Sequence, residues 1–153
     1  LLPDKKGIVK IDGMFPDQFE NFIEEKKEYF NVIFSYSVIQ YVFKESSIWK
    51  FLDAVLSMLA PEGYLYLGDI PNLSMKKRFL SSAEGLEFHQ SYYGEDSYPD
   101  LNKINSVSKE IDDQIVLEIL KRARSKGFHA WVLPQFHDLT FSNRREDIII
   151  KKP

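Results

Sequence analysis

Apolar residues follow two spacings along the chain, and each spacing predicts a different kind of element. Short apolar runs predict strands over Gly7–Ile11, Asn31–Tyr36 and Tyr64–Ile70, and the second run is typical of strands buried on both faces. Apolar residues at helical spacing predict helices from about Gln18 to Glu28 and from Ile48 to Leu59. This alternation favours an α/β fold, with a parallel sheet and helices on its faces.

The ends of the two helices carry their own signals. Asp17 is suited to cap the first helix, and Ser46 or Ser47 is suited to cap the second. The sequence Pro61-Glu62-Gly63 predicts the end of the second helix before the next strand begins.

The rest of the chain has a regular pattern interrupted by one long irregular stretch. We expect a short basic helix over Asn72–Ser82, a helix over Ile111–Lys126, and strands over Phe128–Pro134 and Arg145–Lys152 that form an antiparallel pair. Ala83–Ser108 has no clear periodicity, which is typical of a lid, a binding loop or disorder.

Composition narrows the classes of function. The chain has 153 residues, of which 44% are hydrophobic, and this fits one domain over 1–153 with a sizeable core. A net charge of −3 argues against nucleic acid as a partner. Cysteine is absent, which removes disulfides and thiolate chemistry, and no apolar run is long enough for a membrane span. We therefore expect a cytoplasmic protein.

Four segments carry a resemblance to a known family. They are "FNVIFSYSVIQYV", "FLDAVLSMLAPEGYLYLGDI", "EILKRARSKGFHAWVLP" and "REDIIIKK". In this order they resemble the second half of the Rossmann-like S-adenosylmethionine-dependent methyltransferases, from the fourth strand to the terminal antiparallel strand. The resemblance implies a three-layer, mostly parallel sheet and S-adenosylmethionine as the cofactor.

The family's glycine-rich loop has no counterpart in this sequence. None of the seven glycines forms a G-x-G, and under the resemblance Gly7–Ile11 would correspond to the family's third strand. Two strand–helix units, roughly 60 residues, would then be missing upstream. We expect an incomplete chain or, as an alternative, a sheet completed by another polypeptide, because the edge along Val32–Phe34 would otherwise be exposed.

The resemblance implies cofactor-binding residues at two places. Ser35, Tyr36, Ser37 and Gln40 follow a core strand, where open α/β sheets bind ligands, and they would contact the methionine part. The alternative is that the two hydroxyls cap the next helical turn.

The second place is the stretch from Asp12 through Gly13 to Met14. The Asp12 carboxylate would accept from the adenine amino group, and Met14 would lie on the ring. The alternative is an ordinary Asp-Gly turn.

Acceptor chemistry is predicted at another strand end and in the irregular stretch 83–108. Asp69 follows a core strand and would either face the substrate or cap the next turn. His89 is the first choice for a base that removes a proton from the acceptor, the alternative being an ordinary loop histidine, and the neighbouring Tyr92 and Tyr93 would bind the substrate.

The remaining charged and imidazole groups favour structural roles. His129 lies in a predicted strand and His137 in a loop, and the three histidines have no metal-ligand spacing. Arg144-Arg145 could clamp a phosphate or a carboxylate, but a solvated turn paired with Glu146 and Asp147 is commoner. The run of Lys76, Lys77 and Arg78 is by default a solvated helix face.

Three functional hypotheses follow. The first is a methyltransferase that acts on a sugar, an aromatic or another small organic molecule, with a homodimer as one assembly. The second is a non-catalytic methyltransferase-like module that pairs with a partner, or a fragment without activity. The third is a serine hydrolase, because Ser37, Asp69 and His137 occur in the order of α/β-hydrolases, although Ser37 lacks the flanking glycines.

Overall fold

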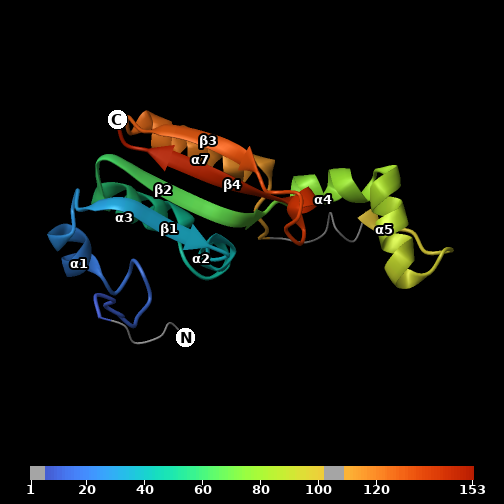
Figure 1. The fold of residues 1–153 in the computed structure, drawn as a ribbon, viewed down its shortest axis with the longest axis horizontal. Helices are drawn as coiled ribbons and strands as arrows, with labels where there is room; N and C mark the ends of the chain where they lie inside the picture. Colours follow the sequence, from blue (N-terminus) through green and yellow to red (C-terminus); the bar gives the residue numbers. More distant parts are fainter. Residues whose placement is uncertain (1–5, 102–108) are drawn as a thin grey trace.

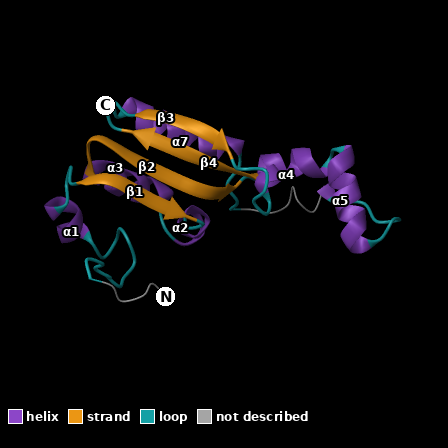
Figure 2. Cartoon of the chain, viewed as in Figure 1, coloured by secondary structure: helices purple, strands orange, loops and turns teal. Residues whose placement is uncertain are grey.

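A computed structural model describes residues 6–101 and 109–153 as an α/β protein, shown in Figures 1 and 2. The elements in chain order are α1 (Glu20–Glu25), β1 (Phe30–Tyr36), α2 (Ile39–Glu45), α3 (Ile48–Met58), β2 (Leu59–Pro71), α4 (Leu73–Leu80), α5 (Ala83–Tyr93), α7 (Asp113–Ser125), β3 (His129–Pro134), the 3-10 turn η1 (Ser142–Arg144) and β4 (Arg145–Lys151).

The four described strands form one open sheet in the order β1-β2-β4-β3. β1 and β2 are parallel, whereas β4 lies between β2 and β3 and is antiparallel to both. The sheet is therefore mixed, and the expectation of a mostly parallel sheet is wrong. The expected antiparallel pairing of the last two strands is confirmed. Gly7–Ile11 forms no strand, so β1 is an edge of the sheet over the described residues.

Helices cover only one face of this sheet. α3 and α7 lie together behind the strands in Figure 1, and their apolar stripes pack on strand residues that include Leu65, Leu67 and Ile148. No described element covers the opposite face, where Val32 and Phe34 remain 65% and 66% exposed. The expectation that β1 is buried on both faces is wrong, because an apolar run cannot itself show whether a second layer is present.

Local capping signals set most helix starts. The Ser47 side chain accepts from the Lys50 N–H and caps α3, and Asn72 accepts from Ser74 and Met75 at the start of α4. Asp17 caps nothing: it accepts from the Ser46 hydroxyl at 3.2 Å and pairs with Lys50 at 3.7 Å. α1 is therefore shorter than predicted, and no side chain caps it.

The first part of 83–108 is regular, which corrects the expectation of an irregular stretch. Ser82 accepts from the Gly85 N–H and starts α5. At Gly85 the helix lies directly on α4, where a Cβ would overlap the carbonyl group of Phe79. The polar and aromatic residues of α5 are not segregated on one face, so its periodicity was hidden. Residues 102–108 of the predicted stretch lie outside the described residues.

α4 and α5 extend beyond the end of the sheet at which β1 and β2 finish, as Figure 1 shows. This arrangement builds a ledge beside the carboxyl ends of the two parallel strands, and the candidate site lies there. None of the helices in the described part of the chain has both the length and the apolar character needed to cross a membrane.

Candidate functional site

The two parallel strands end in residues with unusual backbone conformations. Ser37 directly follows β1 and Asp69 lies near the end of β2, and their φ angles are 56° and 62°. The pairing of β2 with β4 is irregular between Leu67 and Ile70, so Asp69 lies where the ladder is interrupted. Left-handed non-glycine residues are uncommon and concentrate at functional sites.

A cluster of polar side chains is centred on Asp69, and we call it the polar cluster. It comprises Ser37, Tyr66, Asp69, Gln135, Arg145 and Asp147. Ser37 Oγ and Arg145 Nη1 both donate to Oδ2 of Asp69, while Gln135 Nε2 lies 3.4 Å from its Oδ1. Two strand ends and the start of β4 are thereby joined through one buried carboxylate.

Asp147 provides the second carboxylate of this cluster. Its Oδ1 accepts from the backbone N–H of Asp69 at 2.8 Å and from Gln135 at 3.2 Å, and its Oδ2 accepts from the Tyr66 hydroxyl at 2.5 Å. Buried carboxylates are stable only when their oxygens are paired in this way.

The charges of the cluster follow from burial and from these bonds. Burial is the largest single influence on Asp69 and acts to raise its pKa, but the donors Ser37 and Arg145 together outweigh it and hold that pKa below the ordinary value. Burial and the bond to Asp147 raise the pKa of the Tyr66 phenol far above its usual range. Asp69 is thus held as an anion and Tyr66 as a neutral donor.

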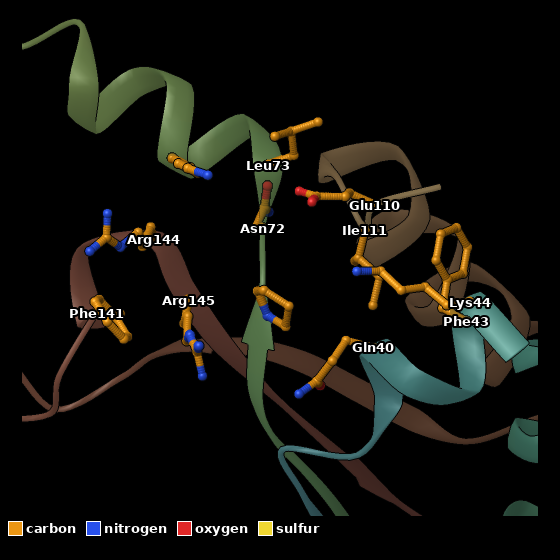
Figure 3. A pocket seen from close by; sticks show the side chains of 12 residues that line it. Gln40, Phe43, Lys44, Asn72, Leu73, Glu110, Ile111, Phe141, Arg144 and Arg145 are labelled. Carbon is orange, nitrogen blue, oxygen red and sulfur yellow. The ribbon is translucent and has the colours of Figure 1, made fainter. Parts of the chain in front are cut away.

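A cavity of about 290 Å³ opens beside the polar cluster, and we call it the α4 cavity. Figure 3 shows Arg144, Arg145 and Phe141 on one side of it, and Gln40, Phe43 and Lys44 on the other. Its lining residues are Gln40, Phe43, Lys44, Pro71, Asn72, Leu73, Lys76, Glu110, Ile111, Phe141, Arg144 and Arg145. This is the ledge beside the carboxyl ends of β1 and β2, where ligands of open α/β sheets bind.

A second cavity, of about 650 Å³, adjoins the first, and we call it the α5 cavity. It brings together His89, Tyr92 and Tyr93, which were the predicted base and substrate residues. His89 Nε2 lies 2.9 Å from Ser97 Oγ, and its ring packs 4.7 Å from that of Tyr93. The two cavities share Leu73, Lys76, Phe141 and Arg144.

The residues of the "SYS" segment do not form one wall. Ser37 bonds to Asp69, and Gln40 Nε2 donates to the Ser37 carbonyl at 3.0 Å, so these two lie together beside the α4 cavity. Ser35 and Tyr36 point to opposite faces of the sheet, as neighbours in a strand must. Ser35 Oγ is buried without a partner, and Tyr36 stacks on Phe34 on the uncovered face.

The predicted adenine-binding residues lie elsewhere. Asp12, Gly13 and Met14 are exposed in the segment that precedes α1, and none of them lines either cavity. The Met14 N–H donates to Gln18 Oε1 at 2.8 Å, which closes a local turn.

The basic residues correct two expectations. Arg145 pairs with Asp69, and neither Glu146 nor Asp147 is its partner in an ion pair. On α4, Arg78 pairs with Asp113 at 2.6 Å and Lys76 lines both cavities, so the run of three is more than a solvated face.

The serine hydrolase arrangement is absent from the described residues. Ser37 bonds directly to Asp69, whereas His137 is almost fully exposed and pairs with Asp138 at 2.8 Å. An imidazole between the hydroxyl and the carboxylate is what that mechanism requires. The described residues also hold no group of three His, Asp or Glu side chains placed to bind a metal.

Sequence reasoning missed Tyr66, Gln135 and Asp147 as members of the polar cluster. Their one signal is that polar groups interrupt or flank apolar strands, as Ser35 to Ser37 do in β1. Comparison with known proteins gives no further guide, since neither a protein family nor a curated protein matches the chain.

Proposed function

We propose that this chain carries the acceptor side, and one end of the cofactor site, of an S-adenosylmethionine-dependent methyltransferase for small molecules. The observation that carries the proposal is the joining of two parallel strand ends by Ser37 and Asp69 beside a cavity. The order of the elements also supports it, because β1, β2, β3 and the antiparallel β4 follow the order of the family's second half.

The residues present fit the methionine end of the cofactor. Gln40 Oε1 is buried without a hydrogen-bond partner in the described structure, and its side chain lines the α4 cavity beside Ser37. An acceptor of this kind fits an ammonium group. When bound, S-adenosylmethionine would supply a methyl group on a sulfonium. The role of Asp12, Gly13 and Met14 rests on the resemblance alone.

His89 would act on the acceptor. It lines the α5 cavity with Tyr92 and Tyr93, and its other described contact is to the Ser97 hydroxyl. In this role its imidazole removes the acceptor proton, while the rings exclude water and orient the substrate. An organic molecule of modest size suits the cavity, and the net charge of −3 gives no support to a nucleic-acid substrate.

Calorimetry of the purified full-length protein with S-adenosylhomocysteine tests the proposal. We expect binding that weakens at least about tenfold in Gln40→Leu, since a hydrogen bond to a charged donor contributes about 1.5–3 kcal/mol. Gln114→Leu, at an exposed position on α7, is the matched control and should bind like the wild type. Absence of binding to the wild type at millimolar ligand would refute the proposal.

A non-catalytic interaction module is the second candidate, and the uncovered sheet face favours it. Phe34 stacks on Tyr36 and Tyr66 there, at ring distances of 5.9 and 5.2 Å, and no described strand pairs with the outer edge of β1. Light scattering after size-exclusion chromatography discriminates the candidates. A module requires a stable assembly that Phe34→Ser disrupts, whereas a monodisperse monomer that binds S-adenosylhomocysteine counts against it.

A further inference from the structure

We infer that the junction of the two cavities is an anion site, and that the acceptor is a small organic molecule carrying a phosphate or carboxylate group. Arg144 would be its main ligand and Lys76 its second. That the ligand is a methyl acceptor rests on the proposed function. The anion site itself rests only on the arrangement of side chains around Arg144.

Arg144 is a cation without a counter-charge. It is half-buried, and among the described residues no carboxylate lies within ion-pair distance of it. Its guanidinium instead lies over three phenyl rings, 4.3 Å from Phe141, 5.2 Å from Phe88 and 5.9 Å from Phe79. Ring faces attract a cation but use none of its N–H donors, so those donors stay available to a ligand.

The backbone holds Arg144 firmly at this place. Its carbonyl accepts from the Asn72 N–H at 3.0 Å, and its own N–H donates to the Phe141 carbonyl at 2.9 Å. Phe141 adopts the left-handed conformation, with φ of 69°, which turns the chain into η1. With the backbone fixed in this way and the guanidinium held by the three rings, the side chain loses little freedom when it binds a phosphate or carboxylate through two parallel hydrogen bonds.

The charge balance around Arg144 also favours an anion. Lys44 and Lys76 line the α4 cavity without a described partner for their ammonium groups, and the acidic residues in the two linings are Glu110 in the α4 cavity and Asp100 in the α5 cavity. Arg145 is neutralised by Asp69. Burial and the neighbouring Arg145 lower the pKa of Arg144, and a bound anion would relieve both effects.

The position of Arg144 defines where the rest of the ligand lies. Arg144 and Lys76 line both cavities, and the α5 cavity adds Phe88, Tyr92 and Tyr93 as aromatic walls. An anionic group at the junction would place an attached ring or chain against those walls, within the cavity that His89 also lines. Free inorganic phosphate would make no use of those aromatic walls.

Titration of the full-length protein with phenyl phosphate, benzoate and neutral benzamide, followed by calorimetry, tests the inference. We expect the two anions to bind and benzamide to bind at least tenfold more weakly. Arg144→Met should weaken anion binding at least about tenfold, Arg144→Lys less, and Lys76→Met a few-fold. Lys77→Met removes the same charge from the same helix outside both cavities and should have no effect.

The outcomes separate the claims. Equal losses in Lys77→Met and Arg144→Met, or equal binding of benzamide, would show a diffuse charge effect and overturn the anion site. Unfolding of each variant in urea shows whether it is folded. If Arg144→Met does not fold, the anion affinity of Arg144→Lys, which keeps the charge, decides the question. Preferred binding of phenyl phosphate over benzoate assigns the phosphate. Anion binding without S-adenosylhomocysteine binding would refute the methyltransferase and leave the anion site standing.

Discussion

Arg144 and Arg145 are neighbours in the sequence, yet within the described part of the chain one is paired with a carboxylate and the other is not. Arg145 closes the polar cluster by pairing with Asp69, and 26% of its side chain is exposed. Among the described residues, the Arg144 guanidinium has ring contacts but no carboxylate partner, and it lines two cavities. Both side chains line the α4 cavity and lie over the Phe141 ring, but only Arg145 reaches the Asp69 carboxylate, so one charge holds the sheet end and the other stays available. The difference separates structural from ligand-binding cations.

The largest expected effect on stability comes from replacing Arg145, the cation that pairs with Asp69. Arg145→Met leaves the Asp69 carboxylate, whose side chain is 9% exposed, without its countercharge and close to Asp147. Breaking a buried pair by removing one partner costs about 3–5 kcal/mol, and the partial exposure of Arg145 places the expected loss near about 3 kcal/mol. Urea unfolding measures it directly.

The double variant Arg145→Met with Asp69→Asn is the control for that loss. Removing both charges should restore part of the stability, since no uncompensated charge remains. A loss that is equal in the single and double variants would mean that Arg145 acts through packing rather than through charge.

Acid should weaken this pair in a defined direction. The pKa of Asp69 lies below its ordinary value in the folded protein, so its stabilising effect is complete above that ordinary value and is lost as pH falls through the folded pKa. The stability difference between wild type and Arg145→Met should therefore shrink between about pH 6 and about pH 3.5. Urea midpoints at the two pH values measure this, and a difference that grows in acid would contradict the assignment.

Much of the fold could be predicted because its signals are local. Ser47, Asn72 and Asp112 each cap the helix that follows, at the start of a periodic apolar stretch. The uncovered face could not be predicted, because the exposure of Val32 and Phe34 depends on whether another layer packs there. α5 was missed for a different reason: its helix lacks an apolar stripe, so no periodicity marks it.

The candidate site could be predicted only where it follows strand ends. Ser37, Gln40 and Asp69 were found by that rule, and they lie together. The partners of Asp69 come from far along the chain: Arg145 is 76 residues away and Asp147 is 78 residues away. Glu146 and Asp147 were predicted as ion-pair partners of Arg145 because the sequence shows which residues are adjacent in the chain but not which are adjacent in space. The antiparallel insertion of β4 beside β2 decides the true pairs.

A smaller loss is expected from the rim of the polar cluster. Tyr66→Phe removes the hydroxyl that donates to Asp147 at 2.5 Å, but Asp147 keeps its bonds from the Asp69 backbone and from Gln135. One hydrogen bond to a charged carboxylate is worth about 1.5–3 kcal/mol, and the ring still stacks on Phe34. We therefore expect the free energy of unfolding in urea to fall by about 1.5 kcal/mol. Tyr64→Phe, without a described bond to the cluster, should change stability less.

The smallest expected effect on stability comes from replacing Arg144, the cation without a described carboxylate partner. Arg144→Met gives up contacts to three rings, worth about 0.5–1 kcal/mol at sites that are not fully desolvated. It also ends the repulsion from Arg145 and the burial of an unpaired charge, both of which oppose the wild-type residue. These effects offset one another. The free energy of unfolding in urea should therefore change by no more than about 0.5 kcal/mol. A loss as large as that of Arg145→Met would show that Arg144 is also a structural cation, because a side chain reserved for a ligand contributes little until that ligand is bound.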